Sequence, residues 1–473
     1  MKVLLTGATG YIAKRLLPVL LDNGHEVVCC VRDKSRFDLG KYQSKKLSVV
    51  QADFLDPASL ENIPKDLEAA YYLIHSMAGA ESSFEKLEAE SARNFKAAIE
   101  RTGARQVIYL SGIVNEKQLS RHLKSRKSVE TILSVSSTFS LTTLRAGIIV
   151  GSGSASFEII RDLVEKLPVM IAPRWLKTRC QPIAIRNVIE FLNGVLGLEA
   201  TWNKSYDIGG PDILTYKEML MGFAEVRGLR RKIFIVPVMT PKLSSYWLYF
   251  VTATSYTLAK NLVDSMKVEV VCQPNNLAEI LGIKPIPYKE AIRMAFDKID
   301  QQQVLSSWSD AQSSPLLGKG LSGLIDVPVN GCFIDKKERK IRDPQTTLAN
   351  IWRIGGRNGW YYANWLWNLR GFIDKIFGGV GLRRGRSNAD DIFTGQSLDF
   401  WRVIFASRED KRLLLYAEMK LPGEAWLEFK IVDNTLYQTA TFRPLGLWGR
   451  TYWYLVLPFH YFIFNGMIER IAK

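Results

Sequence analysis

Residues 2–33 read KVLLTGATGYIAKRLLPVLLDNGHEVVCCVRD, and this stretch decides the fold. The run VLL is apolar without alternation, which is typical of a strand buried on both faces of a parallel sheet. Gly7 and Gly10 predict a tight turn, a helix follows over about residues 11–23, and Gly24 marks its end. The apolar run EVVCCV then predicts a second strand. Strand, glycine turn, helix and strand in this order predict a βαβ unit.

The glycine turn is the first candidate functional site. Gly7 and Gly10 allow the backbone to approach a pyrophosphate, and the N–H groups at the start of the helix face that anion. Thr9, Tyr11 and Ile12 complete the predicted phosphate-binding turn. Because the pattern follows a strand and precedes a helix, it favours a bound dinucleotide coenzyme over a structural turn.

The end of the second strand bears on the choice of coenzyme. NAD-selective sites place a carboxylate there, on the ribose hydroxyls, whereas an arginine can bind the 2′-phosphate of NADP. The strand ends in Arg32 and Asp33. Arg32 favours NADP as the cofactor, and the adjacent Asp33 keeps NAD open.

Polar residues also follow the next strands. The runs LSVVQADF, AAYYLIHSM, QVIYLSGIV and FSLTTLRAGIIVG are strand-like and alternate with helical segments, which predicts an α/β Rossmann fold with a doubly wound parallel sheet. Ligands bind such sheets at the carboxyl ends of the strands. Asp53, Ser76 and Ser111 fall at these ends, so we expect them at the coenzyme edge, with Asp53 near the adenine.

These segments resemble the short-chain dehydrogenase/reductase superfamily, most closely its atypical and extended members, the NmrA-like and epimerase-like proteins. The motifs TGATGYIA, VRDKSR, ADFLD, YLSG and LRAGIIVGSGS carry the resemblance. It covers about residues 1–300 and implies a small substrate-covering subdomain over about residues 175–300. In catalytic members a serine follows the fifth strand, and a Tyr-x-x-x-Lys pair lies on the next helix.

The tract SRHLKSRKSVE, residues 120–130, departs from that pattern. Ser111 matches the serine, but His122 stands at the tyrosine position and Arg126 at the lysine position. Their spacing places both on one face of a helix. The resemblance implies that Ser111 orients the substrate, Arg126 holds the nicotinamide ribose and His122 exchanges a proton as a neutral imidazole. A basic helix that faces solvent or an anion is the alternative.

The resemblance therefore implies an NAD(P)-dependent oxidoreductase that acts on a small apolar carbonyl or alcohol. Two alternatives stay open. One is a catalytically silent NADP(H)-sensing regulatory or binding protein. The other is a sugar-nucleotide epimerase or dehydratase, for which the missing tyrosine is a disadvantage. The small-residue loop over residues 151–156 is interpreted either as a substrate loop or as the entry to a helix.

The composition changes after residue 300. A Gln/Ser/Gly-rich segment predicts a linker over residues 301–330. Residues 331–473 contain four alternating runs separated by turn residues, which predict an antiparallel meander, and then an aromatic-rich helix at about residues 451–472. Antiparallel strands with a closing helix resemble the START/polyketide-cyclase helix-grip fold, an α+β architecture. This resemblance implies an apolar small-molecule ligand between sheet and helix.

The tract GGRNGWYYANWLWNLRGFIDKIFGGVGLRRGR, residues 355–386, is similar to an uncharacterised domain that is often fused to atypical members of the reductase family. Its basic group, Arg383, Arg384 and Arg386, would suit an anionic head group beside tryptophans. Surface charge flanking an aromatic core is the alternative interpretation.

The overall composition limits the partners. The formal charge is +16, but the basic residues are dispersed and not interleaved with aromatics, so we expect no nucleic acid partner. The five scattered cysteines lack metal-ligand spacing and predict a reduced, cytoplasmic protein without a metal site. Met1 leads straight into a strand, so no signal peptide is expected. The apolar run YWYLVLPFHYFIF is shorter than the ~20 residues of a spanning helix, which leaves peripheral membrane contact open. The oligomeric state is not predicted.

Overall fold

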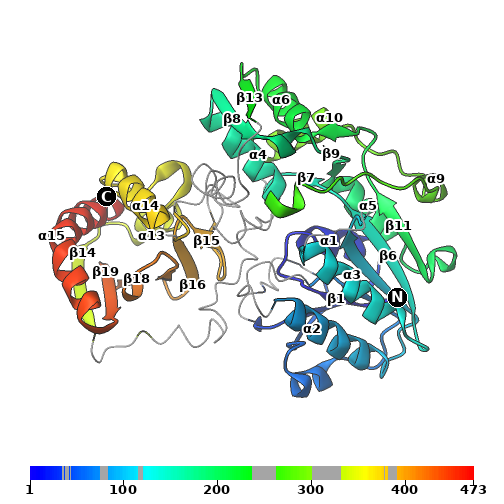
Figure 1. Cartoon of the computed structure of the whole chain (residues 1–473). Coiled ribbons are helices and arrows are strands. Elements are labelled where there is room, and N and C mark those ends of the chain that lie inside the picture. The colour runs from blue at the N-terminus through cyan, green and yellow to red at the C-terminus, as the bar shows by residue number, and fades with distance from the viewer. Residues whose placement is uncertain are drawn as a thin grey trace. The chain divides into compact units, whose positions relative to one another are not determined.

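The structure is a computed structural model of the whole chain (Figure 1). It describes residues 1–34, 37, 42, 44–74, 84–114, 121–236, 263–300, 327, 332–377, 379–381 and 391–473. The chain divides into two compact units near residue 315. Each unit has its own hydrophobic core, so each is described by itself.

A parallel sheet of seven strands forms the centre of the first unit. Its strands are β1 (Lys2–Thr6), β2 (Glu26–Val31), β3 (Leu47–Gln51), β4 (Ala69–Tyr72), β5 (Gln106–Gly112), β6 (Ser140–Ala146) and β11 (Lys204–Ile208). Their order is β11-β6-β5-β4-β1-β2-β3, and every neighbouring pair is parallel. The predicted doubly wound Rossmann sheet is confirmed.

Helices cover both faces of this sheet. They are α1 (Ala13–Asp22), α2 (Phe84–Ile99), α3 (Arg121–Ser134) and α5 (Ile185–Gly194). Val3 and Leu5 of β1 belong to the apolar cluster that contains α1 and α5. Leu4, between them, belongs to the cluster that contains α2 and α3. The unbroken apolar run VLL is therefore explained by burial on both sides.

A third apolar cluster, centred on Phe157, Phe223 and Phe296, holds the rest of the first unit together. It contains residues of α4 (Ala155–Lys166), α6 (Tyr216–Val226) and α10 (Tyr288–Asp300). Short strands accompany these helices: β7 (Ile149–Val150), β8 (Val169–Pro173), β9 (Arg179–Cys180), β10 (Ile183–Ala184), β12 (Leu214–Thr215) and β13 (Lys232–Val236). A short helix, α9 (Leu277–Ile280), packs on the main sheet through Leu277.

The expected covering subdomain over residues 175–300 is not one continuous piece. Within that range, α5 packs on the main sheet through Val188 and Leu192, and β11 is the sheet's seventh strand, beside β6. The part outside the main sheet also includes α4, which precedes residue 175. The chain therefore leaves the sheet after β6, returns for α5 and β11, and leaves again.

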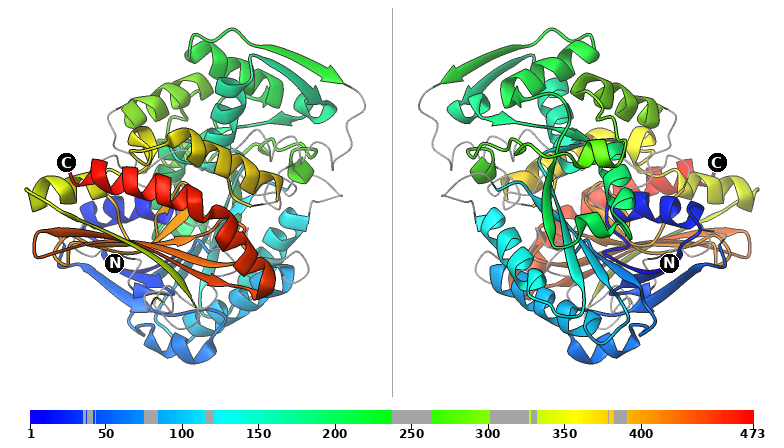
Figure 2. Two further views of the ribbon diagram at one scale, coloured as in Figure 1. Left: turned by 90° about the vertical axis from the view of Figure 1, so that its left-hand side faces the viewer. Right: turned by 90° about the vertical axis from the view of Figure 1, so that its right-hand side faces the viewer.

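The second unit is an antiparallel sheet with helices on one face (Figure 2). Its strands are β14 (Phe333–Lys340), β15 (Ser397–Leu398), β16 (Trp401–Ser407), β17 (Arg412–Ala417), β18 (Gly423–Val432) and β19 (Thr435–Pro444). Their order is β14-β19-β18-β17-β16-β15. The helices are α13 (Pro344–Trp352), α14 (Asn364–Ile376) and α15 (Gly446–Ile471). The predicted antiparallel sheet is present, whereas the helix-grip fold stays a prediction.

The edge strand β14 was not predicted from the sequence. Its sequence, FIDKKERK, is mostly charged, yet burial alternates along it with period two. Phe333 stacks on Trp453 of α15, with ring centroids 5.4 Å apart. Lys337 lies over the ring of Tyr461, also on α15, at 4.9 Å. One face of this charged strand therefore packs under the last helix.

Several expectations concern membranes, thiols or residues outside the described ranges. Among the described residues, no helix is long and apolar enough to cross a membrane. All five cysteines lie in the described part, and none of them forms a disulfide. The predicted linker lies outside the described residues except for Val327, and so do Arg383, Arg384 and Arg386. The cytoplasmic location stays a prediction.

Candidate coenzyme site and active site

The glycine turn after β1 is held against the end of β4. Gly7 has a φ of +64°, and a Cβ atom at this position would lie 2.8 Å from the carbonyl oxygen of Leu73. The Gly10 N–H donates to the Gly7 carbonyl oxygen at 2.7 Å. Glycine at position 7 is therefore required both by the backbone conformation and by the close approach of β4.

A buried threonine fixes the two strand ends to each other. The Thr6 hydroxyl donates to the carbonyl oxygen of Tyr71 at 2.8 Å and accepts from the N–H of Leu73 at 3.0 Å. The sequence analysis did not assign this residue a role. A hydroxyl residue directly before the first glycine, at the end of an apolar strand, is the signal that could have found it.

The start of α1 can bind an anion. The first N–H groups of any helix have no partner within the helix, and the helix dipole makes this end positive. The first turn of α1, described throughout, contains no acidic side chain, and no side chain caps it at Ile12. The backbone N–H groups of residues 8, 9 and 11–13 could therefore hold a pyrophosphate.

Tyr11 connects the glycine turn to the loop before α4. The Arg15 guanidinium lies 3.9 Å from the Tyr11 ring centroid, and its Nη2 donates to the carbonyl oxygen of Ser152 at 2.8 Å. A Cβ atom at Gly151 would lie 2.7 Å from the Tyr11 hydroxyl oxygen. Burial raises the pKa of Tyr11 to about 12, so the phenol is neutral at pH 7.

The loop over residues 151–156 has two expected roles, and its contacts bear on both. Residues 151–154 are buried, and the Ser154 hydroxyl caps α4 by accepting from the Phe157 N–H at 3.2 Å. These contacts are typical of a loop that leads into a helix. Its role as a substrate loop stays a prediction.

Arg32 follows β2, and Asp53 follows β3. The order β3-β2-β1 places both at the carboxyl edge that holds the glycine turn. Arg32 is exposed, and the Asp53 carboxylate accepts from the Leu55 N–H at 3.0 Å. Ser76 lies outside the described residues. The edge therefore brings together the predicted coenzyme residues that are described.

The proposed catalytic residues come from β5 and α3. Ser111 is the penultimate residue of β5 and is 4% exposed. Arg126 of α3 donates from Nη1 to the carbonyl oxygen of Leu110 at 2.8 Å, so its guanidinium reaches the neighbour of Ser111. His122 lies one turn before Arg126 on α3, but its side chain is outside the description. The structure thus brings Ser111 and Arg126 close together and leaves His122 untested.

Tyr109 does not replace the missing tyrosine. It is 1% exposed and belongs to the core between the sheet and α2 and α3. Its hydroxyl donates to the carbonyl oxygen of Arg126 at 3.3 Å. Burial raises its pKa, although the positive charge of Arg126 opposes this shift. Tyr109 is therefore a neutral core residue that helps to position α3.

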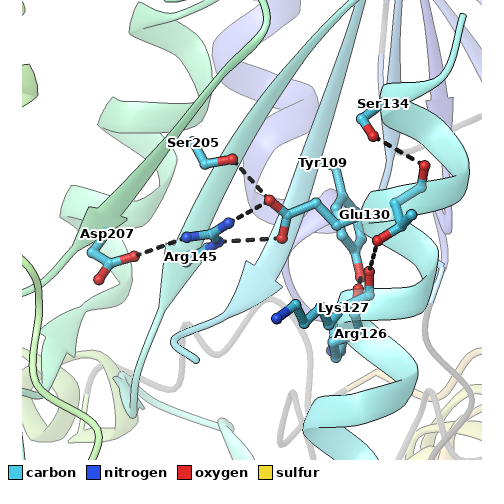
Figure 3. Close-up of polar contacts among 9 residues, drawn as sticks. Tyr109, Arg126, Lys127, Glu130, Ser134, Arg145, Ser205 and Asp207 are labelled. Atoms are coloured by element: carbon cyan, nitrogen blue, oxygen red, sulfur yellow. Dashed lines mark hydrogen bonds and ion pairs between the residues drawn. The ribbon is translucent and has the colours of Figure 1, made fainter. Parts of the chain in front are cut away.

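A row of charged residues crosses the sheet beside Ser111. Arg145 of β6 pairs in register with Ser111 of β5 and with Asp207 of β11. Glu130 of α3 accepts from Arg145 Nε at 3.2 Å and from Ser205 Oγ at 2.8 Å. Figure 3 shows Arg145 between the two carboxylates. We call Glu130, Arg145 and Asp207 the ion row.

Burial raises the pKa of Asp207, while the Gln273 N–H and the charge of Arg145 oppose that shift. The ion row was missed from the sequence, where the arginine in TTLRAG, an otherwise uncharged strand, was its only signal. Because Arg145 binds carboxylates from α3 and β11 together, the ion row fixes the edge strand to the helix that carries Arg126.

Two cavities of the first unit lie outside the glycine turn. One of about 350 Å³ adjoins the ion row and is lined by Lys127, Thr131 and Thr143, among others. The other, of about 990 Å³, is lined by residues of α6, β13 and the start of α10. Neither is lined by Gly7, Ser111 or Arg126. Among the residues described, no cluster of His, Cys, Asp or Glu is placed to hold a metal ion.

Comparison with protein families finds one match in each of the two units. Residues 7–149 match a family described as "NAD(P)H-binding", and residues 331–467 match one described as "Protein of unknown function (DUF2867)". The first match includes the glycine turn and the ends of β2, β3 and β5. The first unit therefore contains an NAD(P)-binding domain of the Rossmann type.

Two curated relatives are reductases. The chain is 25% identical over 253 residues to divinyl chlorophyllide a 8-vinyl-reductase, chloroplastic, of Arabidopsis thaliana, which is 50% of this chain and 60% of the relative. It is 24% identical over 223 residues to the protein of the same name from Cucumis sativus, which is 44% of this chain and 52% of the relative. The chain thus spans between half and two thirds of these relatives.

A solved structure supports the fold of the first unit. A nucleoside-diphosphate-sugar epimerase from Staphylococcus aureus aligns with a TM-score of 0.50 and 17% identity, over 62% of this chain and 100% of the epimerase. At this identity the likeness concerns the fold alone.

Proposed function

We propose that the protein is an NAD(P)H-dependent oxidoreductase that acts on an apolar substrate and prefers NADPH. One observation carries the proposal. In a region that matches an NAD(P)H-binding family, Gly7 has no room for a side chain, and a helix start without acidic residues follows. This geometry supports close contact between the backbone and a pyrophosphate.

The coenzyme, when bound, supplies the hydride. The N–H groups of residues 8, 9 and 11–13 would bind its pyrophosphate, and Arg32 would bind a 2′-phosphate. Arg126 uses Nη1 on Leu110, and a guanidinium has five N–H donors. Its remaining donors could hold the ribose hydroxyls. Ser111 would orient the substrate, and His122 would exchange the proton.

The predicted substrate is a small apolar carbonyl or alcohol. Reduction of a carbonyl leaves an alkoxide, which needs a positioned acid, and a neutral imidazole at His122 is a weak one. A conjugated carbon–carbon double bond is the second candidate. It takes one hydride from NADPH and one proton, which water can provide, and leaves a saturated bond and NADP⁺. The sequence similarity to two vinyl-reductases favours it.

The test is NADPH consumption with apolar aldehydes, ketones and conjugated vinyl compounds, with each product identified by NMR. For carbonyl reduction we expect His122→Ala to lower kcat about 100-fold, as loss of a general acid does. For vinyl reduction we expect His122→Ala to change kcat less than threefold. Lys124→Ala, an exposed change on the same helix, is the control.

Turnover of none of these substrates, with NADPH binding intact, would contradict the proposal and support the silent NADP(H) sensor. Sugar-nucleotide epimerisation without net NADPH consumption would support the epimerase alternative.

A further inference from the structure

The second unit contains an apolar cavity of about 250 Å³ under its last helix. Residues of α14, α15 and the inner face of the sheet line it, including Leu366, Met419, Ala440 and Ile463. Binding sites for drug-sized ligands span roughly 300–1,000 Å³, so this cavity suits a smaller molecule. Its lining favours an apolar one.

Two tryptophans in the lining have hydrogen-bond donors without acceptors. Trp367 is 7% exposed and Trp401 is 5% exposed. Their indole nitrogens are buried and meet no acceptor among the described residues. The indole of Trp360 packs against both, with ring centroids 4.9 Å and 6.1 Å away, and donates to Asp399 Oδ2 at 2.7 Å. Of the three indole N–H groups in this cluster, that of Trp360 is paired, and those of Trp367 and Trp401 lack an acceptor among the residues described.

An indole N–H is a donor only, and leaving a buried donor unpaired is unfavourable. The group that would complete this cluster is therefore an acceptor, such as a carbonyl oxygen. Buried polar groups in native proteins are paired with protein, water or ligand in nearly all cases.

The lining also contains a histidine and an arginine. His460 packs between Trp453 and Phe464, with ring centroids 5.2 Å and 4.9 Å away. Its Nδ1 is buried without a partner among the residues described. Burial is the main reason why the pKa of His460 is lowered to about 4, so the ring is neutral at pH 7. Arg370, whose Nη2 donates to the Lys420 carbonyl oxygen at 3.5 Å, also lines the cavity.

We propose that this cavity binds a small neutral apolar molecule that carries a carbonyl oxygen, to which Trp367 and Trp401 donate. A neutral carbonyl is favoured over a carboxylate because burying an ionised group among apolar side chains is far more unfavourable. The proposal does not depend on the reductase function. A carbonyl compound is, however, also a class of substrate proposed for the first unit.

The test uses the full-length protein without coenzyme and three probes of one ring shape: 1-indanone, indane and indane-1-carboxylate. Calorimetric titration should show 1-indanone binding at least about tenfold more tightly than either of the others, a difference of ~1.4 kcal/mol. Trp367→Phe and Trp401→Phe keep an aromatic ring and remove the N–H. Each should weaken 1-indanone binding about three- to tenfold and leave indane binding unchanged, which also shows that the cavity is intact.

Three further variants complete the test. Trp175→Phe removes an indole N–H of the first unit that is also buried and without a described partner, and it should leave all binding unchanged. Ala440→Leu fills the cavity and should abolish binding of 1-indanone and indane. Unchanged 1-indanone binding in Ala440→Leu, or in both tryptophan variants, would overturn the proposal. If indane-1-carboxylate binds more tightly than 1-indanone, and Arg370→Gln abolishes that binding, the proposal of a neutral ligand is overturned.

Discussion

The hydroxyl oxygen of Tyr11 lies where a side chain at Gly151 would be, 2.7 Å from a Cβ atom built there. The glycine turn after β1 and the loop before α4 therefore pack directly on each other, although they are far apart in the sequence. Arg15 adds a second link by donating to the carbonyl oxygen of Ser152. The shape of the turn consequently depends on the loop.

Gly151→Ala should destabilise the protein and weaken coenzyme binding. The new methyl group would collide with Tyr11 and also with Ile185, and overpacking of this kind lowers the free energy of unfolding by about 1–3 kcal/mol. Tyr11→Phe removes the hydroxyl and should restore part of the loss in the double variant. Urea unfolding of the two single variants and the double variant measures this coupling. Strictly additive losses would show that Tyr11 and Gly151 are not in contact.

Gly7→Ala should abolish NADPH binding, whereas Gly228→Ala should not. Both glycines have positive φ, +64° and +63°, but only a Cβ atom at Gly7 meets a neighbour, the carbonyl of Leu73. Each variant should lose about 1–2 kcal/mol from backbone strain alone, and Gly7→Ala should lose more. Calorimetric titration with NADPH and urea unfolding measure the two effects. Equal losses in both variants would contradict the close approach of β4.

Arg32→Ala should lower the affinity for NADPH without changing that for NADH, because only NADPH carries the 2′-phosphate. The thermal shift at saturating coenzyme reports the affinity through RT ln(1 + [L]/Kd). Lys45→Ala, also exposed but before β3, is the control for loss of positive charge. A larger shift of the wild-type protein with NADH than with NADPH would refute the assignment of Arg32.

Asp207 should make the wild-type protein less stable as the pH rises above about 4. Burial raises its pKa in the folded protein above the ordinary 3.8, so the folded state holds the proton more tightly than the unfolded chain does. The free energy of unfolding then falls as the pH rises from 3.8 through the folded pKa. Asp207→Asn cannot titrate. The wild-type value minus the Asp207→Asn value should therefore decrease over this range in urea unfolding, and a difference that is flat with pH would contradict the raised pKa.

His460 should have the opposite pH dependence. Its pKa falls from 6.5 to about 4 on folding, so between these values the unfolded chain binds the proton and the folded protein does not. The stability from the neutral ring is complete above pH 6.5 and should decrease by roughly 3 kcal/mol on acidification to about pH 4. His460→Gln should lack this decrease. Guanidinium unfolding of the second unit, followed by tryptophan fluorescence, measures it, and parallel curves for both proteins would contradict burial of the ring.

The parts of the fold predicted from the sequence are those with strong local patterns. The glycine turn and the apolar runs of β1 and β2 require only their own residues to be recognised. In the second unit, turn residues separate the strands β16 to β19 and make the meander visible. By contrast, β11 (KSYDI) and β14 (FIDKKERK) are polar edge strands. Their pairing depends on neighbours distant in the sequence, so neither was predicted.

The residues of the candidate site also divide into those that a local pattern identifies and those that depend on residues distant in the sequence. Gly7 and Gly10 are identified by their spacing, and Ser111 and Arg126 through a family pattern that this chain only partly follows. Thr6 was missed because its partners lie on β4. The ion row was missed because it forms only when β6 and β11 align in register and α3 packs beside them.

The edge strand β14 has a consequence for synthesis of the chain. It is the first strand of the second unit to be made, yet its partner is β19, with Phe333 opposite Phe442 and Lys340 opposite Thr435. During synthesis, β14 cannot pair until nearly the whole second unit has been made. Such non-local pairing is slow and prone to aggregation. The charged side chains of FIDKKERK protect the unpaired strand during this time, because charged strands discourage association with other chains.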